Sequence, residues 1–153
     1  LTGRENVGQT MALFGVGLTV GNTFGARMAD RALMPTIGGM LALNAIMLGM
    51  LPWTAPSVLG ASLSIFFVGF SGAIGAGLQT RLMDVARDGQ ALAATLMHAA
   101  FNIANALGAF LGGLAIAAGY GWSSTGPVGS ALAVLGLAVF FVSLWLERRT
   151  SIA

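Results

Sequence analysis

The chain has 153 residues, of which 56% are hydrophobic and 8% are charged, whereas charged residues make up about 25% of a typical soluble domain. This composition excludes an ordinary soluble fold, which would lack the polar residues needed at its surface, and it predicts a membrane protein. The formal net charge is +2 from only 7 dispersed basic residues, which argues against a nucleic-acid partner, and the lack of cysteine excludes disulfides and thiolate metal sites.

Charged and turn-forming residues divide the chain into apolar runs of about the 20 residues that cross a bilayer. The first two runs are separated by the cluster of Arg27, Asp30 and Arg31, and the second ends where Pro52 and Pro56 interrupt any helix. The third run stops at Arg81 and Asp84. The long charge-free stretch that follows is divided by YGWSSTGPVG, whose glycine, serine, threonine and proline residues predict a turn.

The sequence therefore predicts an all-α membrane protein, a bundle of five transmembrane helices. Residues 1–153 are predicted to form part of a transmembrane domain, its carboxyl-terminal part, with helices at about residues 7–26, 33–53, 58–80, 91–118 and 129–146.

Arginine placement predicts the orientation of this bundle. If the helices alternate in direction, only Arg4 lies on one side of the membrane, and the other side holds Arg27, Arg31, Arg81, Arg87, Arg148 and Arg149. By the positive-inside rule the arginine-rich side is cytoplasmic, so the amino terminus is outside and the carboxyl terminus inside. An outside amino terminus without a signal peptide is best understood if further helices precede it, and we interpret the chain as the carboxyl-terminal piece of a larger protein.

The run at residues 91–118 carries a stripe of polar side chains on an otherwise apolar helix. Thr95, His98, Asn102 and Asn105 fall within an arc of roughly 80° at the helical spacing. In hydrocarbon such side chains need partners or water, so this stripe is predicted to face protein or a wet cavity. Two interpretations stay open: the stripe lines a solute path, with His98 as a proton carrier, or it joins helices by hydrogen bonds.

The remaining helices differ in polarity. Residues 33–53 and 129–146 are apolar on nearly all sides and suit lipid contact, whereas the other helices carry rows of glycine that permit close crossings. The expected packing residues are Gly17, Gly21, Gly25, Asn22, Gly108 and Gly112. Ser71 lies among the glycines of the third helix, which weaken that helix, so we expect a bend there.

Catalytic residues, metal ligands and cofactors are not expected. No span holds paired carboxylates, and one histidine without cysteine cannot build a usual zinc site. The sequence therefore predicts a protein that is not an enzyme.

Two segments resemble a known family. They are GVGLTVGNTFGARMADR, residues 15–31, and LQTRLMDVARDGQALAATLMHAAFNIANALGAFLGG, residues 78–113. Together they resemble the carboxyl-terminal half of a major facilitator superfamily transporter, especially the twelve-helix drug:proton antiporters of the arabinose-efflux-permease type. The first is similar to the second-half copy of the loop signature, with its acidic and basic pair at Asp30 and Arg31. The second is similar to the AFNxxNAxGAxxGG pattern of helix eleven.

The resemblance implies that these helices are the eighth to twelfth of twelve and that helices one to seven are the missing partner half. It implies a secondary active transporter in the bacterial inner membrane that exports a small organic solute or drug by alternating access, with protons as the candidate coupling ion. The cavity candidates are then Thr95, His98, Asn102, Asn105 and Ser71. The lipid bilayer is the other expected partner.

The resemblance also bears on the charged loops. It implies that Asp30 and Arg31, with Arg27, latch one conformation by pairing with a helix end or with Arg81 and Asp84; the alternative is a solvated loop pair. Two other functions stay open for the whole chain: a structural membrane bundle that does not transport, and a half-size transporter or pore that acts as a homodimer.

Overall fold

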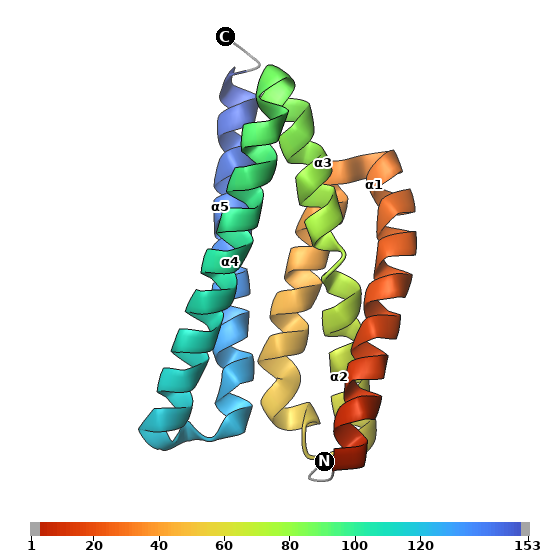
Figure 1. The fold of residues 1–153 in the computed structure, drawn as a ribbon, viewed down its shortest axis with the longest axis vertical. Helices are drawn as coiled ribbons and strands as arrows, with labels where there is room; N and C mark the ends of the chain where they lie inside the picture. The colour runs from red at the N-terminus through yellow and green to blue at the C-terminus, as the bar shows by residue number, and fades with distance from the viewer. Residues whose placement is uncertain (1–3, 151–153) are drawn as a thin grey trace.

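A computed structural model describes residues 4–150, and it describes side chains for residues 8–149 (Figure 1). Within this range the chain forms α-helices and short helical turns and no strands. The helices are α1 (Arg4–Thr54), α2 (Val58–Ser71), α3 (Ile74–Ala86), α4 (Gln90–Ala115) and α5 (Thr125–Thr150). Three helical segments of the described chain are long and apolar enough to cross a membrane: Gly8–Thr54, Val58–Tyr120 and Trp122–Arg149.

Helix α1 is folded back on itself at Ala32, whose φ of −158° and ψ of 85° are not helical. Pro35 explains the position of this kink, because its ring has no N–H for the carbonyl of Arg31 and clashes with it. The hydroxyl of Thr36 donates to the carbonyl of Ala32 at 2.8 Å and so satisfies a carbonyl at the kink. The two parts of α1, residues 4–31 (the first arm) and residues 33–54 (the second arm), run in opposite directions (Figure 1).

Helices α2 and α3 follow one another in roughly the same direction and are separated only by Gly72 and Ala73 (Figure 1). The N–H of Gly72 donates to the carbonyls of Val68 and Gly69 at 3.1 and 3.0 Å, which closes α2 before α3 begins. The interruption lies among the glycines at which the sequence predicts a bend. Ser57 caps the start of α2, since its Oγ accepts from the N–H of Gly60 at 3.0 Å.

Glycines bring α1 and α2 into backbone contact. A Cβ added to Gly17 would overlap the carbonyl oxygen of Phe66, and one added to Gly21 would overlap that of Phe70. At Gly25 an added Cβ would instead lie 2.6 Å from Cε of Met40, on the second arm. Because these positions lack side chains, the first arm approaches two neighbours closely. Its middle approaches α2, and its end near the kink approaches the second arm.

The second arm also packs against α5, which in turn contacts α4. Ser130 of α5 donates its hydroxyl to the carbonyl of Ala45 at 2.7 Å, a hydrogen bond between helices. Gly112 of α4 is buried, and a Cβ there would lie 3.5 Å from Cγ2 of Thr125, whereas Gly108 has no such neighbour within 4 Å.

The connection between α4 and α5 turns at Gly119 and Gly121, whose φ angles of 88° and 76° favour glycine. Helix α5 then begins at Thr125, within the glycine- and serine-rich segment and before the expected span at residues 129–146. Pro127 is compatible with this start, because the first-turn N–H groups of a helix have no partner inside the helix.

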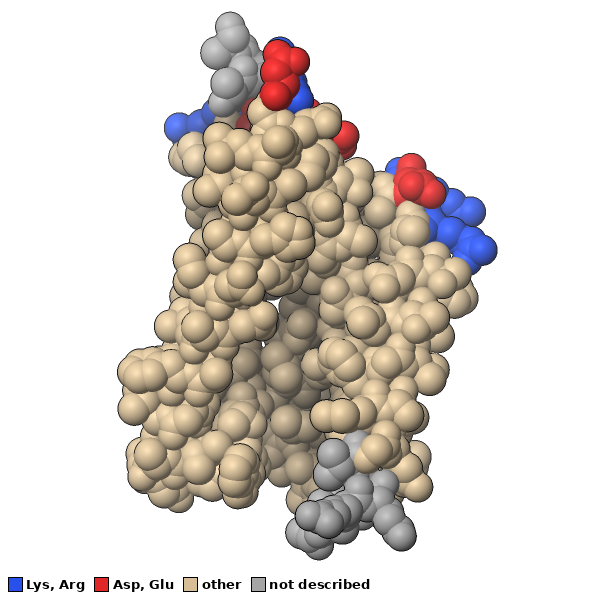
Figure 2. All heavy atoms as spheres, in the orientation of Figure 1, with Lys and Arg blue, Asp and Glu red and all other residues tan. Residues whose placement is uncertain are grey.

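The surface is apolar along the helices and charged at one end. Large hydrophobic side chains such as Met11 and Val139 are 71% and 69% exposed. The described charged residues gather where α1 folds back, where α3 meets α4 and where α5 ends, and Figure 2 shows them together at one end. The side chains of Arg4 and Glu5 lie outside the described part. This distribution is that of an integral membrane protein whose charged end meets the aqueous phase.

Candidate functional site

Helix α4 has three faces at the helical spacing of 100° per residue. The first holds Ala93 and Gly112, which are the buried residues of this helix. The polar stripe is centred roughly 160° from Ala93 and roughly 60° from Gly112 around the helix axis. The third face is a further 120° or so around and is formed by large exposed apolar side chains, namely Leu92, Leu96, Ile103, Phe110 and Leu114. The stripe is therefore opposite Ala93, borders Gly112 and is distinct from the apolar surface of α4.

The polar side chains of the stripe are exposed, as the structure places all of Thr95, His98, Asn102 and Asn105 at the surface of the described chain. The hydroxyl of Thr95 donates to the carbonyl of Ala91 at 3.0 Å, so it is satisfied within α4. His98, Asn102 and Asn105 make no hydrogen bond to any residue of the described range. Since uncompensated amide and imidazole groups are costly in a membrane, these three side chains need water, a solute or another protein segment.

Ser71, the other cavity candidate, has a different environment from the stripe. It is 0% exposed, and its hydroxyl donates to the carbonyl of Val68 at 2.9 Å within α2. The structure thus brings the four α4 residues together on one exposed surface and leaves Ser71 inside the packed end of α2.

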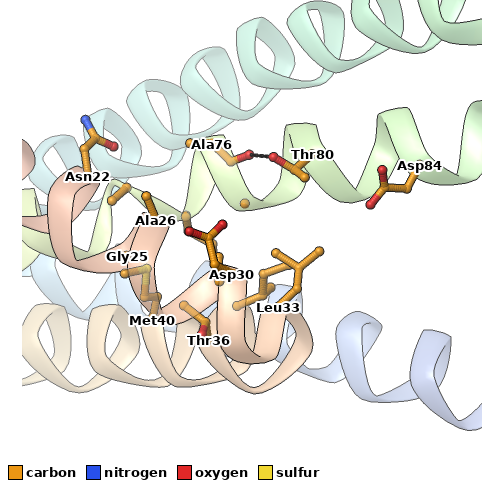
Figure 3. Close-up of a pocket in the computed structure, with 15 residues that line it drawn as sticks. Asn22, Gly25, Ala26, Asp30, Leu33, Thr36, Met40, Ala76, Thr80 and Asp84 are labelled. Atoms are coloured by element: carbon orange, nitrogen blue, oxygen red, sulfur yellow. Dashed lines mark hydrogen bonds between the residues drawn. The ribbon is translucent and has the colours of Figure 1, made fainter.

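A pocket of about 340 Å³ lies at the charged end between the two arms of α1 and α3. Its polar lining comes from Asn22, Asp30, Thr36, Thr80 and Asp84. Figure 3 shows Asp30 near the middle, with Asn22 and Asp84 at opposite ends. The threonine hydroxyls donate within their own helices, to the carbonyls of Ala32 and Ala76. Asn22, which the sequence suggests as a packing residue, is exposed in the described chain and is among the residues that line this pocket.

The charged residues at this end form an ion pair that the sequence did not predict. Arg81 of α3 pairs with Glu147 of α5, with side chains that are 34% and 49% exposed. Among the described side chains neither Asp30 nor Arg31 forms an ion pair, so their expected pairing with Arg81 or Asp84 is not present in this conformation. No sequence signal links Arg81 to Glu147, because they lie 66 residues apart.

Asn44 is a second feature that the sequence did not single out as a site. It lies in the second arm, and its Oδ1 is buried without a hydrogen-bond partner; among the described side chains no other buried polar atom lacks one. Its only signal in the sequence is that it is the strongly polar residue of an otherwise apolar run. A buried amide oxygen in a membrane-spanning helix calls for a donor from water or from a further protein segment.

Proteins named as transport proteins are similar to this chain. The chain is 37% identical over 141 residues to the protein named Inner membrane transport protein YdhP of Escherichia coli (strain K12), an alignment that covers 92% of the chain and 36% of that protein. It is 34% identical over 155 residues to the protein named Uncharacterized MFS-type transporter YfhI of Bacillus subtilis (strain 168), with 97% and 38% covered. No family model matches the chain, and no solved structure matches it significantly.

The likeness extends over nearly the whole chain, but the chain spans little more than a third of the length of these relatives. Together with the long apolar helices, it shows a helical membrane protein that is similar to one part of proteins named as transporters.

Proposed function

We propose that this chain is the carboxyl-terminal part of a major facilitator superfamily secondary transporter, with helices eight to twelve of twelve. The five crossings would be the first arm of α1, its second arm, α2 with α3, α4 and α5, close to residues 7–26, 33–53, 58–80, 91–118 and 129–146. Two observations support this proposal: the relatives are named as transport proteins, one of them as MFS-type, and the chain matches only about a third of each.

The transported molecule in this proposal is a small organic solute, exported across the bacterial inner membrane by alternating access in exchange for protons. The inner membrane is supported by the name of the Escherichia coli relative. The gathering of arginines at one end supports a cytoplasmic charged end, with the amino terminus outside and the carboxyl terminus inside. Within the described spans no carboxylate lies away from the charged end, so either His98 carries the proton or the coupling acid belongs to the partner half.

The observation that carries the proposal is the unpartnered stripe of α4. His98, Asn102 and Asn105 are exposed and have no hydrogen-bond partner in the described chain. A solute cavity between two halves of a transporter supplies the water and polar ligand that such side chains need. Thr95 extends the same surface toward the charged end.

The charged end would bias the equilibrium between the two access states. In the conformation described here Arg81 is held by Glu147, and Asp30 lines the neighbouring pocket without an ion-pair partner in the described range. Rocking of the two halves would break the pair of Arg81 with Glu147 and form new ion pairs at this end. Besides Asp30, the charged groups available for such pairs are Arg27, Arg31 and Asp84. Differences of a few kcal/mol suffice to shift such a two-state equilibrium.

Labelling of single cysteines in the full-length protein tests whether the stripe is wet. Asn102→Cys is expected to react with a membrane-impermeant maleimide added from one side of the membrane. Ile103→Cys is the matched control, because Ile103 is 68% exposed on the apolar face of the same helix turn. We expect fast labelling at position 102 and little at position 103.

Equal protection of both cysteines would contradict a wet cavity, and so would faster labelling of Ile103→Cys. Protection of position 102 together with disulfide crosslinking to a neighbouring helix would support the structural bundle instead. The chain can also be reconstituted without the proposed helices one to seven. If Asn102→Cys is then still labelled and solute is still exchanged, the homodimeric half-size transporter is supported.

A further inference from the structure

A second cavity lies on the outside of the bundle, between the second arm of α1 and α5, and we call it the α1–α5 groove. Its volume is about 780 Å³. One wall is formed by α1 residues near the kink and the other by α5 residues near its end: Met34, Pro35, Gly38, Gly39, Phe140, Phe141, Leu144, Glu147 and Arg148. The groove thus joins an apolar channel along the helices to charged side chains at the aqueous end.

The apolar part has the form of a channel because glycines border it. A Cβ added to Gly39 would have no neighbour within 4 Å, so this position opens onto empty space. At Gly38 an added Cβ would lie 2.9 Å from the ring of Phe140, which closes the inner side of the groove. The rings of Phe140 and Phe141, with centroids 5.7 Å apart, form the facing wall. Such a channel suits a hydrocarbon chain and offers it no polar partner.

The charged part has a net positive character toward the groove. The carboxylate of Glu147 is held by Arg81 of α3, which offsets its negative charge. Arg149 stacks on the ring of Trp145, with its guanidinium carbon 3.8 Å from the ring centroid. Arg148 lines the groove and has no ion-pair or hydrogen-bond partner within the described chain. Its guanidinium is therefore available to an external anion, and guanidinium groups bind phosphate through paired hydrogen bonds.

We infer that the α1–α5 groove binds one anionic glycerophospholipid, whose phosphate contacts Arg148 and whose acyl chain lies between Gly39 and Phe141. Basic residues between transmembrane helices at the membrane surface are the expected partners of acidic lipid headgroups. The groove lies at the charged end of helices that are otherwise apolar, so its apolar part is at the depth of the acyl chains. A bound lipid would join the second arm to α5 from outside the bundle.

The experiment is native mass spectrometry of the purified full-length protein, titrated with dioleoylphosphatidylglycerol or dioleoylphosphatidylcholine. We expect one tightly held phosphatidylglycerol per chain. Arg148→Gln should weaken its binding about fivefold, which corresponds to the loss of one arginine at a lipid surface. Arg149→Gln is the matched control, since it removes the neighbouring charge, which is engaged by Trp145, and should change binding less than twofold.

Gly39→Leu tests the apolar part of the same groove, because a Cβ there would meet nothing within 4 Å and the longer side chain would extend into the open space. It should weaken binding of both lipids while the protein keeps its thermal unfolding temperature. Competition with inorganic phosphate in roughly a hundredfold excess over the lipid separates a lipid from a free phosphate: the lipid should stay bound.

Equal weakening by Arg148→Gln and Arg149→Gln would overturn the inference, since it would indicate diffuse attraction to a positive end. Displacement of the lipid by phosphate would overturn it as well, and so would equal affinity for the two lipids. None of these outcomes depends on solute transport, so they leave the proposed function untouched.

Discussion

Gly21 of the first arm lies against the carbonyl oxygen of Phe70 in α2, so closely that a Cβ at position 21 would overlap this oxygen. Gly17 has the same relationship to Phe66, one turn away on both helices. The crossing of α1 and α2 is therefore set by the contact of two backbones. Such a contact tolerates only glycine, because any Cβ would push the two backbones apart. The close approach matters because helix association in a membrane depends on packing contacts.

Replacement of Gly21 by alanine is expected to destabilise the full-length protein by about 1–3 kcal/mol, the usual cost of overpacking a tight contact. The measurement is thermal or denaturant unfolding in detergent. Gly15→Ala is the matched control on the same arm, because a Cβ at Gly15 meets nothing within 4 Å, and it should be neutral or slightly stabilising. Equal effects of the two substitutions would show that the crossing does not require glycine.

Loss of the hydroxyl of Ser130 is expected to weaken the contact between α5 and the second arm. Ser130→Ala removes the hydrogen bond to the carbonyl of Ala45 and should cost about 0.6 kcal/mol, the average found for such bonds between membrane helices. Ser143→Ala provides the control, since no hydrogen bond of Ser143 is present in the described chain. Unfolding curves that move by the same amount for both variants would assign the effect to helix propensity.

The ion pair between Arg81 and Glu147 should couple α3 to α5 only weakly, because both side chains are partly exposed. A double-mutant cycle with Arg81→Gln and Glu147→Gln is expected to give a coupling of up to about 1 kcal/mol. The coupling should shrink as the salt concentration is raised from roughly 0.1 to 1 M, because salt screens the electrostatic attraction between the two side chains. A cycle between Arg81→Gln and Arg148→Gln serves as the reference, and coupling of equal size there would argue against a specific pair.

Under the proposed transport function, Asn102→Leu is expected to abolish solute exchange while leaving folding intact, because the amide is exposed and bonds to nothing in the described chain. Its readouts are the unfolding temperature and solute movement in inverted membrane vesicles, with the solute taken from a growth-inhibition screen of the expressing cells. Ile103→Leu, on the apolar face of the same turn, should leave both unchanged. If Asn102→Leu instead unfolds, and the fraction that stays folded keeps full activity, the amide joins helices and does not contact the solute.

Sequence patterns were informative where the physical cause is local. The stripe at Thr95, His98, Asn102 and Asn105 is a property of helical spacing, and the structure does place these side chains together on an exposed surface. Ser71 shows the limit of such reasoning, since a hydroxyl among glycines suits either a cavity or a packed interface. The environment of Ser71 depends on which helix is its neighbour, and spacing within one helix does not contain that information.

The sequence by itself determined that the chain belongs in a membrane and that its charges divide it into apolar helices. It also determined that one of these helices carries a stripe of uncharged polar side chains. These conclusions follow from the hydropathy of the residues and from the helical periodicity of the polar ones, both of which can be read directly along the chain. Only the tertiary structure decided that Arg81 meets Glu147, that Asn44 buries an unpaired oxygen and that the α1–α5 groove exists. Each of these depends on the mutual placement of helices distant in sequence, which is fixed by bare glycine backbones and the shapes of side chains against one another.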